Sequence, residues 1–497
     1  MSITFNQVPA TAAASAVFLE EEGKQVSLGA LLIEHRLAIL GQYNSGKSPT
    51  ANVPALSSSE AEDIAAYGQG SMLHLMLKKA RAAAPYLKLY AVPLAPAGTG
   101  VAAVGSIQVT HAPSAAGTMA IFIGGQKISV AVAADDTVNE VAAAIEAAID
   151  AALDLPVTAS VSTDTVTLTA KWPGATGNDI RIQQDLDSGD LAAEPAAVTV
   201  TITAMATGAN NPALATALAA LGGTWYTAIA NPYQDATAIT DIEAAALVRA
   251  GAGVKKPFLA VFGYTGTKAN YQAAVTARNS PFASWVPVED SPSLSLEIAA
   301  VAGALYGNRQ GLQPGTPMRY RALTGIRAGA GAEWTYLDND NTVKLGGSTT
   351  RALPDGTVQM IDFATTYKRN AQGTADSTYR FADWLGNWQT KLYSLDALFG
   401  AAPFSDAIVV DDATPSGKDY VLRPNTVKAY AIKLIDELWV ALGLTKNRDT
   451  VVAGIVCEIN VGNPGRIDIS IPDVFSAGLR IIAGKVAWSF YAPTTAE

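Results

Sequence analysis

Four residues near the N-terminus have the types and the spacing of a phosphate-binding loop. Gly41, Gly46, Lys47 and Ser48 in GQYNSGKSPT satisfy the pattern G-x-x-x-x-G-K-S/T. In that chemistry, backbone N–H groups surround the phosphate oxygens, the lysine neutralises their charge, and the hydroxyl binds a magnesium ion. The pattern therefore raises the hypothesis of a nucleotide-binding protein.

The pattern works only if a strand leads into the loop and a helix begins at the Lys-Ser pair. The apolar run RLAILGQ predicts the strand. Pro49 is compatible with a first helical turn, but Pro54 falls in what would be the second turn, where proline costs about 3 kcal/mol. The following residues indicate a loop, with a helix beginning near Ser58. We therefore predict that the match is accidental and that these residues bind no nucleotide.

Other candidate catalytic groups are weaker. The acidic segment VEDSP (288–292) follows a predicted parallel strand, where α/β enzymes place their chemistry, although capping of the next helix explains it as well. His35, His74 and His111 are far apart in the sequence, and Cys457 in its apolar run is predicted to be a buried, unreactive thiol. We predict no catalytic site, no metal site and no cofactor.

Composition bounds the class of protein. The chain has 497 residues, of which 49% are hydrophobic and 16% charged, so it can form two to four domains with sizeable cores. The formal net charge of −10 and the lack of any Lys/Arg run argue against a nucleic-acid partner. No apolar stretch is long enough to span a bilayer, which predicts a soluble product of a cytoplasm without membrane insertion.

Strand and helix patterns alternate in two separate parts of the chain. Residues 28–94 have the pattern strand–loop–helix–strand, and the alternation resumes at residue 213, which predicts a mostly parallel or mixed sheet. Between them lies a Thr/Val-rich region with hairpin turns at 124–125 and 163–164 and one helix. The predicted fold is an α/β core split by the insertion of a small β-rich domain.

The rest of the chain is predicted to be an α+β region that starts with a β-hairpin over 341–367, turning at 354–356. Two amphipathic helices (377–400 and 423–444) and two final strands (465–472 and 478–491) are predicted to follow. The predicted parts are an N-terminal arm with the first part of the core (1–97), the inserted domain (98–209), the second part of the core (210–314) and a C-terminal assembly region (315–497).

Both ends of the chain are predicted to be strands with one apolar face. The first alternates in SITFNQVP, and the last alternates in KVAWSFY. A terminal strand must pair with something or it frays, which leaves two options: donation to another chain or folding back within its own chain. The predicted strand residues are Ser2, Ile3, Thr4, Phe5, Asn6, Lys485, Val486, Ala487, Trp488, Ser489, Phe490 and Tyr491.

The chain resembles contractile-tail sheath proteins of the phage Mu-like type. The resemblance lies in GTMAIFIGGQKISVAVAADDTVNEVAAAI and LPVTASVSTDTVTLTAKWPGATGNDIRI, in LDNDNTVKLGGSTTRALPDGTVQMIDFATTY, and in the ending RIDISIPDVFSAGLRIIAGKVAWSFY. It spans nearly the whole chain in order, and its motifs are structural rather than catalytic.

The resemblance implies a structural protein of a virion tail that is assembled in the host cytoplasm. Such subunits form a homo-oligomer of stacked rings or helical strands around a tail tube protein, with baseplate and tail terminator proteins as further partners. The sheath shortens and drives the tube through the target envelope, and terminal arms complete sheets in neighbouring subunits. Two alternatives stay open: an α/β nucleotide-binding enzyme with an inserted β-domain, and an adhesin-like binding protein.

Overall fold

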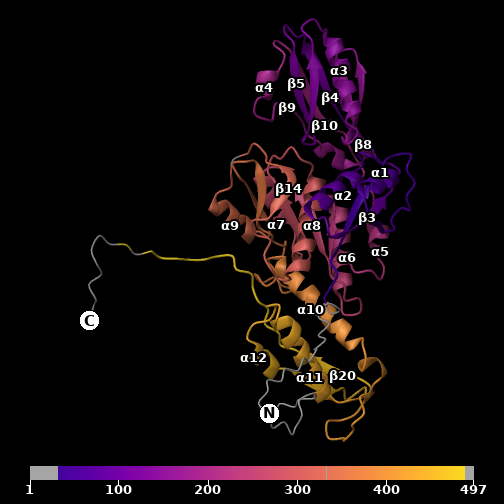
Figure 1. The fold of residues 1–497 in the computed structure, drawn as a ribbon, viewed down its shortest axis with the longest axis vertical. Coiled ribbons are helices and arrows are strands. Elements are labelled where there is room, and N and C mark those ends of the chain that lie inside the picture. Colours follow the sequence, from indigo (N-terminus) through magenta and orange to yellow (C-terminus); the bar gives the residue numbers. More distant parts are fainter. Residues whose placement is uncertain (1–31, 332, 487, 489–497) are drawn as a thin grey trace, which may run out of the picture.

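The structure, a computed structural model, describes residues 32–331, 333–486 and 488. Its elements form three parts that follow one another along the long axis of the molecule (Figure 1). A mostly parallel sheet with its helices lies in the middle, the residues of the predicted insertion lie at one end, and the C-terminal helices lie at the other. The protein is a mixed α/β protein with one parallel-rich sheet and several small antiparallel sheets.

The central six-stranded sheet joins strands from both sides of the predicted insertion, in the order β13-β12-β11-β1-β3-β2. All its pairs are parallel except that of β2 with β3. The predicted strand RLAILGQ is confirmed as β1, whose continuous apolar run is typical of a parallel strand covered on both faces. The strands are β1 (Arg36–Gln42), β2 (Ala55–Ser57), β3 (Lys88–Leu94), β11 (Ala228–Ala230), β12 (Leu259–Tyr264) and β13 (Ala283–Pro287).

Helix α8 (Ser295–Leu312) is the most deeply buried helix of this core. Every residue from Ser295 to Ala304 is buried, because α8 contacts the sheet on one side and helix α2 on another. A Cβ atom at Gly303 would lie only 3.0 Å from a methyl carbon of Leu37 on β1, so helix and sheet approach closely there. The other helices of the core are α1 (Glu60–Tyr67), α2 (Met72–Ala83), α5 (Ala215–Ala219), α6 (Ala236–Ala250) and α7 (Lys268–Thr276).

The residues between β3 and β11 form two antiparallel sheets, ordered β10-β4-β8-β7 and β6-β5-β9, and one long helix. Both predicted hairpin turns are confirmed: Gly124 and Gly125 join β5 to β6 with φ values of +57° and +78°, and Thr163 joins β7 to β8 at +56°. The elements are β4 (Ala102–His111), β5 (Gly117–Ile123), β6 (Gln126–Val132), α3 (Val138–Ala151), β7 (Val157–Ser162), β8 (Thr165–Pro173), β9 (Ile182–Gln184), α4 (Asp190–Ala193) and β10 (Thr199–Ala206).

A three-stranded antiparallel sheet, β14-β16-β15, follows the core. The predicted hairpin at 354–356 joins β15 to β16, but the prediction of β-structure from residue 341 is wrong, because residues 341–344 end helix α9. A capping box starts this helix: the Thr335 hydroxyl accepts from the Asp338 N–H, and the Asp338 carboxylate accepts from the Thr335 N–H. The elements are β14 (Ala322–Arg327), α9 (Tyr336–Lys344), β15 (Thr349–Ala352) and β16 (Thr357–Asp362).

Helix α10 (Asp383–Phe399) leads from the core to a smaller C-terminal part with its own hydrophobic cluster (Figure 1). Cys457 lies here on a two-stranded sheet and is half-buried, so the prediction of a fully buried thiol is wrong. The elements are β17 (Ile408–Val409), β18 (Val421–Leu422), α11 (Pro424–Leu434), a π-helical segment (Ile435–Val440), α12 (Arg448–Ala453), β19 (Val456–Ile459) and β20 (Ile467–Ser470).

The predicted terminal strands fall largely outside the described residues, which include none of Ser2–Asn6, Ala487 or Ser489–Tyr491. Lys485, Val486 and Trp488 are described, and none of them lies in a strand of this chain. The C-terminal segment instead runs away from the body of the subunit (Figure 1). The predicted strand over 478–491 is therefore not formed within the described part of the chain, since a strand needs a neighbouring strand to pair with.

Candidate functional site

The backbone after β1 does not have the arrangement that a phosphate-binding loop requires. Gly41 is the penultimate residue of β1, and after Gln42 the chain turns, with the Lys47 N–H donating to the Asn44 carbonyl at 3.2 Å. No helix begins at Lys47 or Ser48, and the next helix starts at Glu60. The N–H groups at Gly46, Lys47 and Ser48 thus lack the helix N-terminus that favours phosphate in such loops.

Side chains also fill the space beside the end of β1. A Cβ atom at Gly41 would lie 3.2 Å from Leu73 Cγ and 3.3 Å from Met72 Cγ, both at the start of α2. The next residue, Gln42, is buried, and its Nε2 donates to the carbonyl of Pro173 at 2.8 Å. Helix α2 and the end of β8 therefore pack against the last two residues of β1.

The carboxyl ends of the parallel strands face the predicted insertion, and ionic contacts join the two. Arg181 donates to Asp290 Oδ1 at 3.1 Å and to the Thr265 carbonyl at 3.0 Å, at the ends of β13 and β12. Nearby, Arg327 donates to Asp187 at 2.6 Å. Open α/β sheets bind their ligands at this edge, whereas here much of the edge is an interface between two parts of the same chain.

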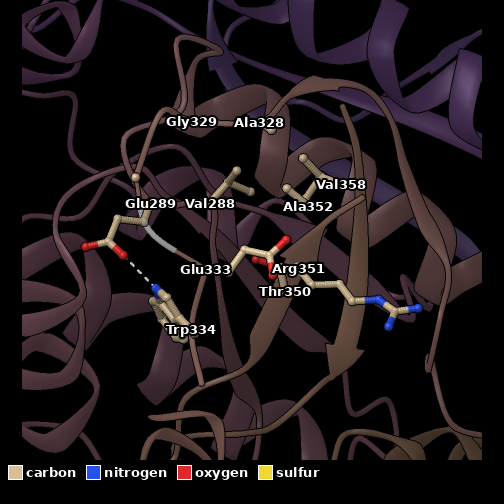
Figure 2. Close-up of a pocket in the computed structure, with 11 residues that line it drawn as sticks. Val288, Glu289, Ala328, Gly329, Glu333, Trp334, Thr350, Arg351, Ala352 and Val358 are labelled. Carbon is tan, nitrogen blue, oxygen red and sulfur yellow. Dashed lines mark hydrogen bonds between the residues drawn. The ribbon is translucent and has the colours of Figure 1, made fainter. Parts of the chain in front are cut away.

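A small cavity lies at the acidic strand end singled out in the sequence (Figure 2). It measures about 60 Å³, enough for only a few water molecules. Glu289 accepts from the Lys268 backbone N–H at 2.6 Å and from Trp334 Nε1 at 2.5 Å, and Figure 2 shows its carboxylate turned toward Trp334. Glu289 therefore caps α7 and holds Trp334 in place. The expectation that this acidic segment caps the next helix is wrong, because the capped helix precedes β13 in the chain.

The three histidines each have a separate structural contact. His35 Nδ1 lies 3.1 Å from the Thr227 hydroxyl, and His74 Nδ1 accepts from the Gly70 N–H. His111 Nδ1 lies 2.7 Å from the Thr199 hydroxyl on the exposed β4–β10 pair. Burial lowers the pKa of His35 to about 4, so this side chain is neutral near pH 7.

Two kinds of feature are absent from the described part of the chain. It contains no cluster of three or more His, Cys, Asp or Glu side chains that could hold a metal ion. Among the same residues, no helix combines the length and the apolarity that a membrane span requires.

Several large apolar side chains of the C-terminal segment are exposed to solvent in the subunit. Leu479, Ile481 and Ile482 are 69%, 78% and 81% exposed, and Val486 is 88% exposed. Arg480, which lies among them, is only 15% exposed. Groups of exposed large apolar side chains are typical of interaction surfaces. Of these four residues only Val486 belongs to the predicted interacting strand 485–491, and none of the four belongs to either hydrophobic cluster of the subunit.

The residues that hold the base of this segment were not predicted. Lys391 on α10 forms an ion pair with Asp473, which lies before the exposed residues. Asp383, also on α10, forms an ion pair with Arg480, which lies between Leu479 and Ile481. The partners are 82 and 97 positions apart in the sequence, so no local spacing could have indicated them.

A curated protein of known family matches this chain along nearly its full length. The chain is 26% identical over 471 residues to the Mu-like prophage FluMu tail sheath protein of Haemophilus influenzae, covering 94% of this chain and 96% of that protein. No protein-family model matches. The resemblance inferred from the sequence is confirmed by this match.

Two solved structures are similar at 12% sequence identity. A sheath tail protein of Desulfitobacterium hafniense has a TM-score of 0.47, with 93% of this chain and 100% of that chain covered. A sheath tail protein of Listeria innocua has a TM-score of 0.45, with 86% and 89% covered.

Proposed function

We infer that the chain is a structural subunit of a contractile tail sheath of the Mu-like type, and that it is not an enzyme. The observation that carries this inference is the collinear match to a curated tail sheath protein over 94% of the chain. A match of that extent includes the core, the inserted region and the C-terminal part together. It therefore concerns the whole subunit rather than one shared domain.

We propose that the subunit forms a homo-oligomer around a tail tube protein, between a baseplate and a tail terminator. The sheath would belong to the tail of a phage-like particle assembled in the host cytoplasm. Its contraction would drive the tube through the target envelope. The energy would come from the difference between two packings of the same lattice, so that no fuel molecule is needed. The lack of a helix beginning at Lys47 or Ser48 supports this proposal over the nucleotide-driven alternative.

We further propose that both ends of the chain are strands donated to neighbouring subunits. The exposed apolar run from Leu479 to Val486 supports this for the C-terminal end. Strands β19 and β20 form a two-stranded sheet, so in the described part of the chain each has one edge without a neighbouring strand. An added strand can pair with such an edge through main-chain hydrogen bonds. The N-terminal residues 2–6 remain a prediction from the sequence alone.

Electron microscopy of the purified full-length protein tests the proposed function. We expect wide hollow tubes or stacked rings, because a sheath subunit carries the contacts that close around a tube. An adhesin-like protein or an α/β enzyme would instead give discrete particles of one or a few subunits. Discrete particles at every protein concentration and ionic strength would contradict the proposal.

We also propose that residues 98–209 are a separate folding unit between the two parts of the core, 1–97 and 210–314, with 315–497 as the assembly region. In support, the two sheets of the inserted region contain only strands from this region. It also has buried apolar side chains of its own, among them Ile107, Phe122, Ile145 and Leu168. Its described contacts with the core include ion pairs such as Lys78–Asp154 at 2.6 Å.

The isolated 98–209 fragment is expected to unfold in one cooperative thermal transition. The matched variant Leu168→Asp should lose this transition, because it places a charge in the fragment's own buried centre. Circular dichroism during heating measures both. A fragment without a cooperative transition would contradict the boundaries.

A further inference from the structure

The chain that leads to the exposed C-terminal segment is bonded to the loop after the π-helical segment. The Ser476 N–H donates to the Leu444 carbonyl at 3.0 Å, and the Lys446 N–H donates to the Val474 carbonyl at 2.9 Å. Phe475 lies between them and forms an antiparallel bridge with Thr445. Residues 473–476 are thus fixed by backbone pairing before the chain becomes exposed.

A buried ion pair joins this fixed segment to helix α10. The Lys391 ammonium has no exposed surface and lies 2.5 Å from Asp473 Oδ2, with a second hydrogen bond to the Leu444 carbonyl at 3.0 Å. It also lies 4.0 Å from the centre of the Phe475 ring. Asp473 in turn accepts from the Thr445 hydroxyl at 2.8 Å. Removing either charge would leave the other largely buried without an oppositely charged partner, which is strongly unfavourable.

A second ion pair lies where the chain leaves the subunit. The Arg480 guanidinium pairs with Asp383, the first residue of α10, and the two side chains are only 15% and 11% exposed. The guanidinium also lies 3.6 Å from the centre of the Phe381 ring, and the Arg480 carbonyl accepts from Arg319 at 2.6 Å. The next residue, Ile481, is 78% exposed. Leu479, the residue before Arg480, is already 69% exposed, so Arg480 is the last residue held against the subunit before the continuously exposed residues 481–486.

The two ion pairs lie on one helix that is itself bonded to the central sheet. Asp383 and Lys391 are eight residues apart, which corresponds to about 12 Å along a helix. Between them, Gln389 donates to the carbonyls of Thr227 at 2.8 Å and Pro257 at 3.0 Å. Thr227 directly precedes β11, and Pro257 lies two residues before β12. Helix α10 therefore contacts the C-terminal segment and the sheet within two to three turns, and Figure 1 shows it running between the core and the C-terminal part.

We propose that α10 is a strut that couples the C-terminal segment to the central sheet, with Arg480 and Lys391 as the residues that position the segment. The proposal rests on the proposed function, in which this segment is donated to a neighbouring subunit. A pull on the donated strand would act first on Arg480, then through α10 on the sheet. The direction in which the donated strand leaves the subunit would then be fixed. Its residues would therefore pair with the strand of the neighbouring subunit in a single register.

The test compares Arg480→Gln in the full-length chain with the matched control Lys433→Gln. Lys433 lies on α11 in the same part of the subunit, is 66% exposed and has only a distant partner, Glu437, at 4.0 Å. Arg480→Gln should raise the subunit concentration needed for half-maximal assembly by about tenfold, the change that 1.4 kcal/mol corresponds to. Arg480→Lys should restore part of the assembly, because it retains the charge beside Asp383, and the control should assemble like the unaltered chain.

Hydrogen exchange of the unassembled subunits provides a second readout. Amides of residues 477–482 should exchange faster in Arg480→Gln, while those of α11 stay unchanged. Assembly at an unaltered concentration in Arg480→Gln would overturn the proposed strut. The proposed function would still stand in that case if a chain lacking residues 481–497 failed to assemble. It would fail separately if the unaltered chain formed no sheath.

Discussion

A chain that ends at residue 484 is expected to fold normally but not to polymerise, and a chain that lacks residues 2–6 is expected to behave in the same way. Neither hydrophobic cluster of the subunit, in its described part, contains a side chain from 479–488, so the C-terminal truncation removes nothing from them. A donated strand would form about five backbone hydrogen bonds, each with a net value of ~0.5–1.5 kcal/mol. Because the contact is repeated at every subunit, its loss should abolish assembly.

Sedimentation velocity of the truncated and full-length chains measures this difference, and two point variants grade it. Trp488→Asp places a charge on the predicted apolar face of the donated strand and should block assembly. Ser489→Thr, on the opposite face, should have a mild effect. If the truncated chains still formed full-length sheaths, strand donation would be wrong. If they unfolded, the terminal residues would belong to the subunit's own core.

The sequence predicted those parts of the fold that depend on local patterns. The apolar run of β1, the glycines at 124 and 125 and the alternation of strands with helices each determine structure through neighbouring residues, and each is confirmed. Helix α9 was missed because its polar sequence YLDNDNTVK has no apolar periodicity. The one local signal, a capping box from Thr335 to Asp338, could have indicated where it begins.

The candidate site was less predictable, because its contacts join distant parts of the chain. Glu289 was noticed for its position after a strand, but its partner Trp334 is 45 residues away. Lys391 was predicted only as part of an amphipathic helix, and nothing nearby indicates that Asp473 neutralises it. A sequence pattern identifies a charged residue, whereas burial and pairing depend on the tertiary structure.

Glu297→Gln is expected to stabilise the core at pH 8 but not at pH 5. Glu297 lies in the first turn of α8 with 1% of its surface exposed, and burial raises its pKa to about 7 despite Lys79, whose Nζ lies 3.4 Å away. Its Oε1 is buried, and no hydrogen bond to it is found in the described part of the chain. Burial thus disfavours the ionised carboxylate more than the ion pair favours it.

The sign of the effect follows from proton binding. Between the unfolded pKa near 4.5 and the folded pKa near 7, the folded protein binds the extra proton, so its stability falls as the pH rises through this window. The rise of the pKa from 4.5 to about 7 corresponds to a loss of folding stability of about 3 kcal/mol at high pH. Glutamine does not titrate, so the variant should avoid this loss above pH 7. Burial lowers the pKa of His35 to about 4, so the folded protein also becomes less stable as the pH falls below 6.5. This effect is the same in the variant and in the unaltered chain, so it cancels in their difference.

Thermal unfolding of the subunit at pH 5, 6, 7 and 8 measures the difference between Glu297→Gln and the unaltered chain. The matched control Glu62→Gln removes an exposed carboxylate from α1 and should change stability by little at any pH. A gain that grows from pH 5 to pH 8 supports a carboxyl group that is protonated in the folded core. A difference that is constant over this range would mean that Glu297 has the same charge in the folded and unfolded chain, and that its pair with Lys79 fully compensates for its burial.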